Sequence, residues 1–84
     1  MIKVLFFARI REQLKVDDLS IQFSEKTKSV EDLISVIVTS HCQQSEHVLS
    51  ADNVVIAVNQ QIAGKDLQLT DGDEVAFFPP VTGG

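Results

Sequence analysis

The sequence predicts an α+β fold, in which one main helix packs on one face of a mixed sheet of about five strands. Apolar residues recur at three- and four-residue spacing through residues 30–42, which is typical of an amphipathic helix. Short runs rich in β-branched and aromatic residues lie on both sides of this helix. With 84 residues, 44% of them hydrophobic, the chain suffices for one domain with a single core.

The first strand is predicted at residues 2–8, a β-branched and aromatic run. Alternation places Lys3, Leu5 and Phe7 on the face opposite Ile2, Val4, Phe6 and Ala8. Residues 9–16 are mostly helix-forming, with Ile10 and Leu14 four apart, and predict a short helix. Residues 19–23 alternate apolar with polar, which predicts a half-buried second strand. These two strands are close enough along the chain to pair as an antiparallel hairpin.

The main helix is predicted to begin after Ser29, whose hydroxyl can cap its first turn. Glu31 and Asp32 then suit the positive end of the helix dipole. Its apolar stripe consists of Val30, Leu33, Ile34, Ile37, Val38 and Cys42. We expect this helix to cross one face of the sheet with the usual right-handed connection.

The second half of the chain begins with residues 43–52, which are polar and predict a short helix or an irregular connection. Residues 54–58 form an apolar run of the kind found in central strands that are buried on both faces. Asn59-Gln60 is expected to turn the chain after this strand.

Short extended pieces, broken by Gly64, are predicted in residues 62–69. Asp71-Gly72 is a tight-turn signal, and it leads into a last strand at residues 74–78. The chain is therefore expected to contain a folded domain at residues 1–78 and an extended tail at residues 79–84.

An apolar surface is predicted on the outer face of the first and last strands. If these strands are neighbours, Leu5, Phe7, Ala76 and Phe78 share one face beside Lys3. The long helix covers the opposite face, so this aromatic surface is expected to bind a partner. The alternative is that the short helix or the connecting loops shield it.

Composition excludes several classes of function. The net charge of −5, from 12 acidic and 7 basic residues, argues against nucleic acid and anionic membranes as partners. It suits a partner with a basic docking face. A single cysteine allows no internal disulfide, and no signal peptide is visible, so a reducing, cytoplasmic location is expected.

Catalytic and metal-binding motifs are weak. Cys42 lies on the apolar face of the helix, where a buried structural thiol is the expected interpretation. His41 and His47 have no neighbouring pattern of cysteine or carboxylate ligands, so no metal site is predicted. No phosphate-binding glycine loop and no Ser/His/Asp arrangement is evident. The chain is therefore not expected to act as an enzyme on its own.

The tail is the feature that most suggests function. Pro79 and Pro80 lack backbone donors, so the sheet must end near Phe78. The six residues 79–84 can reach roughly 20 Å when extended, at about 3.3 Å each. Gly83 and Gly84 carry no Cβ and can enter a channel too narrow for other residues. The alternative is an ordinary frayed chain end.

Four stretches carry a resemblance to the sulfur-carrier subunits of bacterial molybdopterin synthase. They are Met1 to Ala8, Arg11-Glu12, Val58-Asn59 and Leu69 to Gly84, of which Asp71 to Gly84 is the most specific. Residues 17–53 match that family in pattern but not in particular residues. The resemblance implies a β-grasp, ubiquitin-like fold whose first and last strands lie side by side, which agrees with the surface predicted above.

The resemblance also implies a chemical role. An E1-like enzyme would use ATP to adenylate the carboxylate of Gly84, and sulfur would then replace an oxygen to give a thiocarboxylate. The tail would insert into the large synthase subunit and donate sulfur to cyclic pyranopterin monophosphate, within a heterotetramer. Cofactors would be covalent and transient, AMP or sulfur, with no metal. The inserted tail would comprise Pro80, Val81, Thr82, Gly83 and Gly84, and the docking residues for both partners would be Phe7, Ile62 and Phe78.

Two alternatives stay open at this point. A related carrier, such as the thiazole-forming sulfur carrier or a tungsten-pathway homologue, shares the fold and the Gly-Gly end. The run from Phe77 to Thr82 favours the molybdopterin type. A ubiquitin-like modifier or plain interaction module would have no sulfur chemistry and would form isopeptide links or simple complexes.

Overall fold

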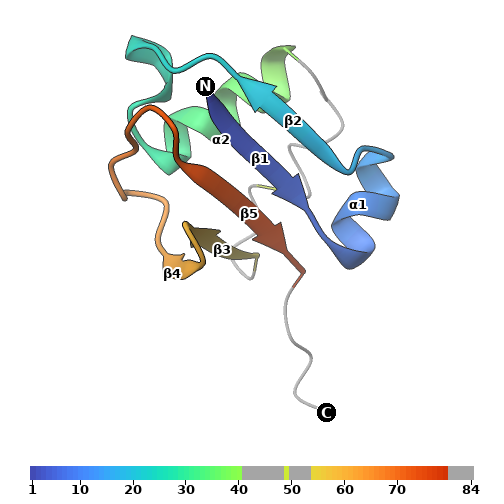
Figure 1. Cartoon of the computed structure of the whole chain (residues 1–84). Helices are drawn as coiled ribbons and strands as arrows, with labels where there is room; N and C mark the ends of the chain where they lie inside the picture. The colour runs from blue at the N-terminus through green and yellow to red at the C-terminus, as the bar shows by residue number, and fades with distance from the viewer. Residues whose placement is uncertain (41–48, 50–53, 80–84) are drawn as a thin grey trace.

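The computed structural model describes residues 1–40, 49 and 54–79 (Figure 1). Its elements are β1 (Ile2–Phe6), α1 (Ala8–Leu14), β2 (Asp18–Ile21), the 3₁₀ helix η1 (Glu25–Thr27), α2 (Val30–Ser40), β3 (Val55–Val58), β4 (Gln61–Ala63) and β5 (Glu74–Phe78). The five strands form one sheet in the order β2-β1-β5-β3-β4. β1 and β5 are parallel and the other pairs are antiparallel, so the predicted mixed sheet is confirmed.

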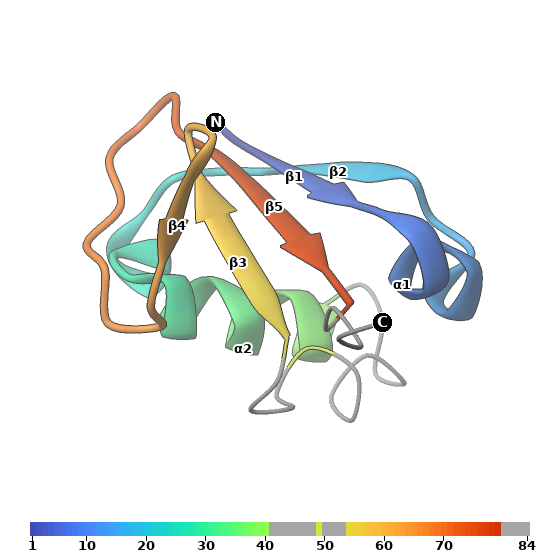
Figure 2. The same cartoon turned by 90° about the horizontal axis from the view of Figure 1, so that it is seen from below.

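The sheet and α2 form the two layers of the fold. Figure 2 shows α2 along one face of the sheet, with α1 beyond the end of β1. The core fills the space between the layers, and its fully buried side chains include Ile2, Val4, Phe6, Val30, Leu33, Ile37, Leu49, Val75 and Phe77. The predicted α+β architecture with one main helix on one face is therefore confirmed.

The first strand is shorter than predicted. β1 ends at Phe6, and the Phe7 N–H makes one more hydrogen bond, of 3.2 Å, to the carbonyl oxygen of Phe77. Ala8 then has a φ of 52°, in the left-handed region, which ends the extended conformation and starts α1. α1 also ends early, because Lys15 has a φ of 60° and caps its C-terminus. The alternation of apolar and polar residues alone does not reveal that β1 ends before Ala8 or that α1 ends before Lys15.

The second strand is shorter than predicted as well. β2 ends at Ile21, and Phe23 packs against the core from outside the strand. The cause is a local hydrogen-bonding preference, since Ser24 caps η1. The Ser24 N–H donates to Thr27 Oγ1 at 2.9 Å, and the Lys26 N–H donates to Ser24 Oγ at 3.2 Å. These reciprocal bonds favour a helical turn over a continued strand.

The start of α2 agrees with the sequence. Ser29 Oγ accepts a hydrogen bond of 3.1 Å from the Asp32 N–H, which confirms the predicted cap. The first four residues of the predicted apolar stripe are buried and Val38 is half-buried. The last, Cys42, lies outside the described residues, as do His41, His47 and all of residues 43–52 except the buried Leu49.

The second half of the sheet confirms the predicted central strand. β3 lies between β5 and β4 and is buried from Ile56 to Val58. Asn59 and Gln60 form the expected turn, which joins β3 to the edge strand β4. Of the extended pieces predicted in residues 62–69, one is β4 and another bridges Gln68 to Ser29.

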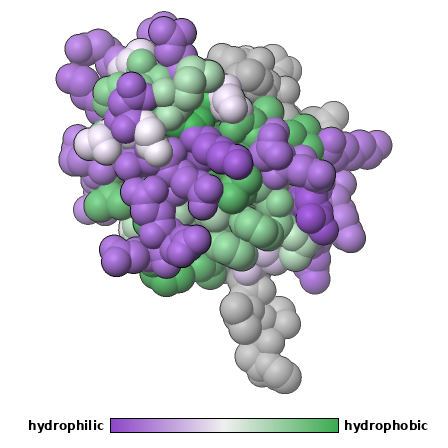
Figure 3. Space-filling model, in the orientation of Figure 1, coloured by the Kyte–Doolittle hydropathy of each residue, from purple (hydrophilic) through white to green (hydrophobic). Residues whose placement is uncertain are grey.

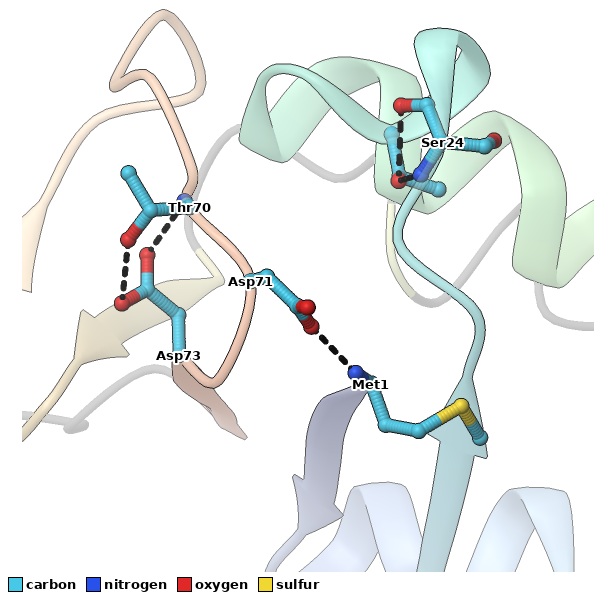
Figure 4. Close-up of polar contacts among 6 residues, drawn as sticks. Met1, Ser24, Thr70, Asp71 and Asp73 are labelled. Atoms are coloured by element: carbon cyan, nitrogen blue, oxygen red, sulfur yellow. Dashed lines mark hydrogen bonds and ion pairs between the residues drawn. The ribbon is translucent and has the colours of Figure 1, made fainter.

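The turn before β5 is fixed by a polar network. Gly72 adopts a φ of 97°, which confirms the turn predicted at Asp71-Gly72. The Thr70 N–H donates to Asp73 Oδ2 at 2.8 Å and the Thr70 hydroxyl to Asp73 Oδ1 at 3.1 Å (Figure 4). Asn59 Nδ2 also donates to Asp73 Oδ1, at 3.0 Å, and the amino group of Met1 pairs with Asp71. This network joins two turns and the start of β1 at one end of the sheet.

Asp73→Ala is expected to lower the free energy of unfolding at neutral pH by about 1 kcal/mol, because it removes several acceptors from this network. The Thr70 N–H and then the Asn59 amide hold the pKa of Asp73 below its ordinary value of 3.8. A lowered pKa means that the contribution is present above the unfolded-state pKa and is lost as pH falls through the folded-state pKa.

The measurement is urea unfolding of both proteins at about pH 7 and about pH 3. The difference between them should shrink at the lower pH. Glu12→Gln on the exposed side of α1 is the control and should track the wild type. A difference that is as large in acid as at neutrality would contradict a role for the ionised carboxylate.

Candidate functional site

The outer face of the sheet, opposite α2, carries the candidate site. β1 and β5 are hydrogen-bonded neighbours, with Leu5 paired to Ala76. The strand alternation therefore places their inward residues in the core and gathers their outward residues on one surface. This confirms the prediction that the first and last strands lie side by side.

This surface contains an open hollow of about 440 Å³, which we call the outer hollow. It is lined by Leu5, Phe7, Ala57, Gln60, Ile62, Glu74, Ala76 and Phe78. Ala57 and Ala76 pair across β3 and β5, and their small side chains leave room between the larger residues. Ile62 is 77% exposed, an unusual fraction for a large apolar side chain. Figure 3 shows hydrophobic atoms on this face, bordered by hydrophilic ones.

Two phenylalanine pairs stack on opposite faces of the sheet, one in the core and one on the outer surface. Phe6 and Phe77 are buried and stack with ring centroids 5.8 Å apart. Phe7 and Phe78 are half-buried on the outer face, and their rings stack at 4.7 Å with an angle of 5°. Phe78 is the last residue of β5, so this outer pair lies where the chain leaves the sheet. Phe6 and Phe77 therefore belong to the core, whereas Phe7 and Phe78, their neighbours in the sequence, belong to the outer face.

The outer face changes from polar to apolar along the strands. Lys3 and Glu74 are paired in the register at the start of β1 and β5, whereas Phe7 and Phe78 lie at the other end. Within residues 1–40, 49 and 54–79, neither Lys3 nor Glu74 forms an ion pair. Glu74 lines the outer hollow and Lys3 is its register partner on β1, so both charges remain available to a partner on this face.

The structure brings together three of the site residues expected from the resemblance. Phe7 lies between β1 and α1, Ile62 in β4 and Phe78 at the end of β5, and all three line the same hollow. Pro80, Val81, Thr82, Gly83 and Gly84 lie outside the described residues. Sequence reasoning missed Ala57 and Gln60. It left Glu74 out of the predicted surface, although alternation along the last strand puts Glu74 on the same face as Ala76 and Phe78. No local signal marks Ala57 and Gln60, because their place depends on the pairing of β3 with both β5 and β4.

Among residues 1–40, 49 and 54–79, no group of three or more His, Cys, Asp or Glu side chains is arranged to hold a metal ion. No helix in those residues combines the length and the apolar character needed to cross a membrane.

Comparison with known proteins gives one family. The ThiS family matches residues 4–84. The "Molybdopterin synthase sulfur carrier subunit" of Escherichia coli K12 is 41% identical, and the match covers 100% of both chains. This relative is therefore similar to the chain over its full length.

Two solved structures show the same fold. SAMP1 from Haloferax volcanii superposes with a TM-score of 0.80 over 99% of this chain and 98% of its own, at 24% identity. Subunit 1 in a complex of subunits 1 and 2 of the molybdopterin-converting factor from Helicobacter pylori gives a TM-score of 0.67 over 99% and 97%, at 23% identity. The β-grasp, ubiquitin-like fold is thus confirmed. With end-to-end similarity in sequence and in fold, the chain belongs to the ThiS family and, within it, to the molybdopterin synthase sulfur carrier subunits.

Proposed function

We propose that this protein carries sulfur for molybdopterin synthase on the carboxyl group of Gly84. The observation that carries the proposal is the 41% identity, over the whole of both chains, to the sulfur carrier subunit of Escherichia coli. The outer hollow supports it, because it supplies an exposed apolar docking surface beside the exit of the tail.

The proposed loading chemistry follows from the reactivity of a carboxylate. With a terminal pKa near 3.5, the carboxyl group is ionised at neutral pH and is a poor electrophile. In the E1-like enzyme a carboxylate oxygen attacks the α-phosphorus of ATP, pyrophosphate leaves and an acyl-adenylate forms. A persulfide donor then attacks the carbonyl carbon with its outer sulfur and AMP leaves, which gives an acyl disulfide. A second thiol attacks the donor's inner sulfur, the S–S bond breaks, and the donor leaves as a disulfide with that thiol. The outer sulfur remains on the carbonyl carbon as a thiocarboxylate, a softer nucleophile than the carboxylate.

In the proposed delivery step, Pro80, Val81, Thr82, Gly83 and Gly84 enter the large subunit. There the thiocarboxylate sulfur reacts with cyclic pyranopterin monophosphate, and hydrolysis at the carbonyl carbon returns the carboxylate. No side chain in this tail is a carboxylate, an amine or an imidazole that could transfer a proton. The catalytic residues are therefore expected on the large subunit. This chain contributes delivery and orientation, since holding two reactants together removes most of the entropic cost of their meeting.

Docking is proposed to use Phe7, Ile62 and Phe78 for both partners in turn. These side chains line one hollow, and a small apolar surface of this kind is typical of a protein interface. The Helicobacter pylori structure, a complex of subunits 1 and 2, supports a large subunit as one partner. Because both partners would use the same surface, they would compete for the carrier.

We place this cycle in the cytoplasm, because the loading step consumes ATP. We also propose a heterotetramer of two carriers and two large subunits.

The net charge of −5 favours partners with basic docking faces and disfavours nucleic acid or anionic membranes. No permanently bound cofactor is needed, since AMP and sulfur are attached to Gly84 only transiently.

The proposal is tested by intact mass spectrometry of the protein purified from its host. A fraction of the molecules should be heavier by the mass difference between sulfur and oxygen, and added large subunit with cyclic pyranopterin monophosphate should remove it. A thiazole-pathway carrier would carry the same mass but would not discharge to that substrate. A modifier would instead appear in isopeptide adducts. Absence of the heavier species in a host with an intact activating enzyme would contradict the proposal.

A further inference from the structure

The turn between β3 and β4 has an unusual backbone. It contains two residues, Asn59 and Gln60, with φ values of 51° and 70°. Positive φ at both positions is the signature of a type I′ hairpin turn, in which Asn followed by Gly is the favoured pair. Glutamine therefore occupies a position where its Cβ is unfavourable and glycine would be relaxed.

The first turn residue is explained by contacts within the chain. Asn59 Nδ2 donates to Asp73 Oδ1 at 3.0 Å, and Asn59 Oδ1 accepts from the Glu74 N–H at 3.1 Å. Its backbone N–H donates to the Glu74 carbonyl oxygen at 2.8 Å. Asparagine also tolerates the left-handed region better than most residues. The positive φ of Asn59 is therefore explained by hydrogen bonds that stabilise the fold.

The second turn residue has no such explanation. The Gln60 side chain is exposed and has no hydrogen-bond partner among the described residues. It nevertheless lines the outer hollow, at its polar end with Glu74. Backbone strain that no internal contact requires is found preferentially at functional sites.

We propose that Gln60 is a specificity-determining contact for the large subunit. The inference rests on the proposed function, in which that subunit covers the outer hollow. The primary amide offers both a donor and an acceptor beside an otherwise apolar surface. It is suited to pair with a peptide group, or with another group that both donates and accepts, on the partner. Glycine would relax the turn but would leave that partner group without its hydrogen bonds on docking.

The test compares Gln60→Gly and Gln60→Ala with the wild type. Calorimetric titration against the purified large subunit should show a Kd weakened about five- to tenfold in both variants, because both lose the amide. Thermal unfolding should separate them. Gln60→Gly relieves the strain and should raise Tm by about 2–5 °C, whereas Gln60→Ala keeps the Cβ and should leave Tm near the wild-type value.

Each outcome decides the question. If both variants bind as tightly as the wild type, the contact does not exist, although the proposed function stands. If only Gln60→Gly binds weakly, the loss comes from a more flexible turn and the inference is wrong.

An unchanged or lower Tm for Gln60→Gly would overturn the argument from strain. Asn59→Gly should lower Tm and is the control, since it removes the contacts to β5. If the wild type itself fails to bind the large subunit, the proposed function fails as well.

Discussion

Deletion of Gly84 is expected to reduce thiocarboxylate formation and sulfur transfer to background while the fold stays intact. The proposed reaction takes place on the terminal carboxyl group, and no side chain of the tail can replace it. Shortening the chain moves that group by one residue, about 3.3 Å, out of reach of reacting atoms that must approach within about 3–3.5 Å. The readouts are intact mass after incubation with the activating enzyme and ATP, and product formation with the large subunit.

Extension of the chain beyond Gly84 provides a second form of this prediction. One added residue blocks the reacting carboxyl group with a peptide bond, so it should abolish loading as completely as deletion does. Neither change touches the described core, so the Tm of both proteins should match the wild type within error. An extended, unprocessed protein that still acquired sulfur would refute the assignment of Gly84.

Phe7→Ala and Phe78→Ala are expected to weaken binding to the large subunit about 10- to 100-fold, as removal of a central aromatic contact does. Their cost in stability should be about 1–3 kcal/mol, from one aromatic pair plus the burial of part of each ring, because both rings are half-buried. Binding by calorimetry and unfolding in urea separate the two effects.

The neighbouring residues supply matched controls. Phe6 and Phe77 are 2% and 0% exposed and form the buried pair. Phe77→Ala is expected to cost about 3–5 kcal/mol of stability, a large part of the total for a small domain. Folded Phe77→Ala protein should still bind, because the outer face is unchanged. If Phe78→Ala instead unfolded the protein while affinity stayed constant, the outer pair would belong to the core.

The details that the sequence missed share a cause. Ala8 fits both a strand and a helix, so alternation could not show that its φ of 52° ends β1. Phe23 continues the alternation of β2, but the hydrogen bonds of Ser24 end the strand first. In both places a local backbone choice overrides a pattern of hydrophobicity that reports only burial.

The site was partly within reach of the sequence. Alternation placed Phe7 and Phe78 on one face and Phe6 and Phe77 on the other, as the structure confirms. Ile62 entered only through the family resemblance, because the sequence around β4 carries no signal for its position. Gln60 could not be selected at all, since both its φ of 70° and its place at the outer hollow depend on the pairing of β3 with β4.

By itself, the sequence determined the main helix with its apolar stripe, the strand faces and the turn at Asp71-Gly72, because spacing and turn chemistry are local properties. The family followed from the resemblance of residue stretches such as Asp71 to Gly84. Only the tertiary structure decided the strand order β2-β1-β5-β3-β4 and thus which remote side chains share the outer hollow. The physical reason is that periodicity records how deeply each residue is buried. The pairing of distant strands, and the surface it creates, depends on contacts between two segments that no single stretch of sequence contains.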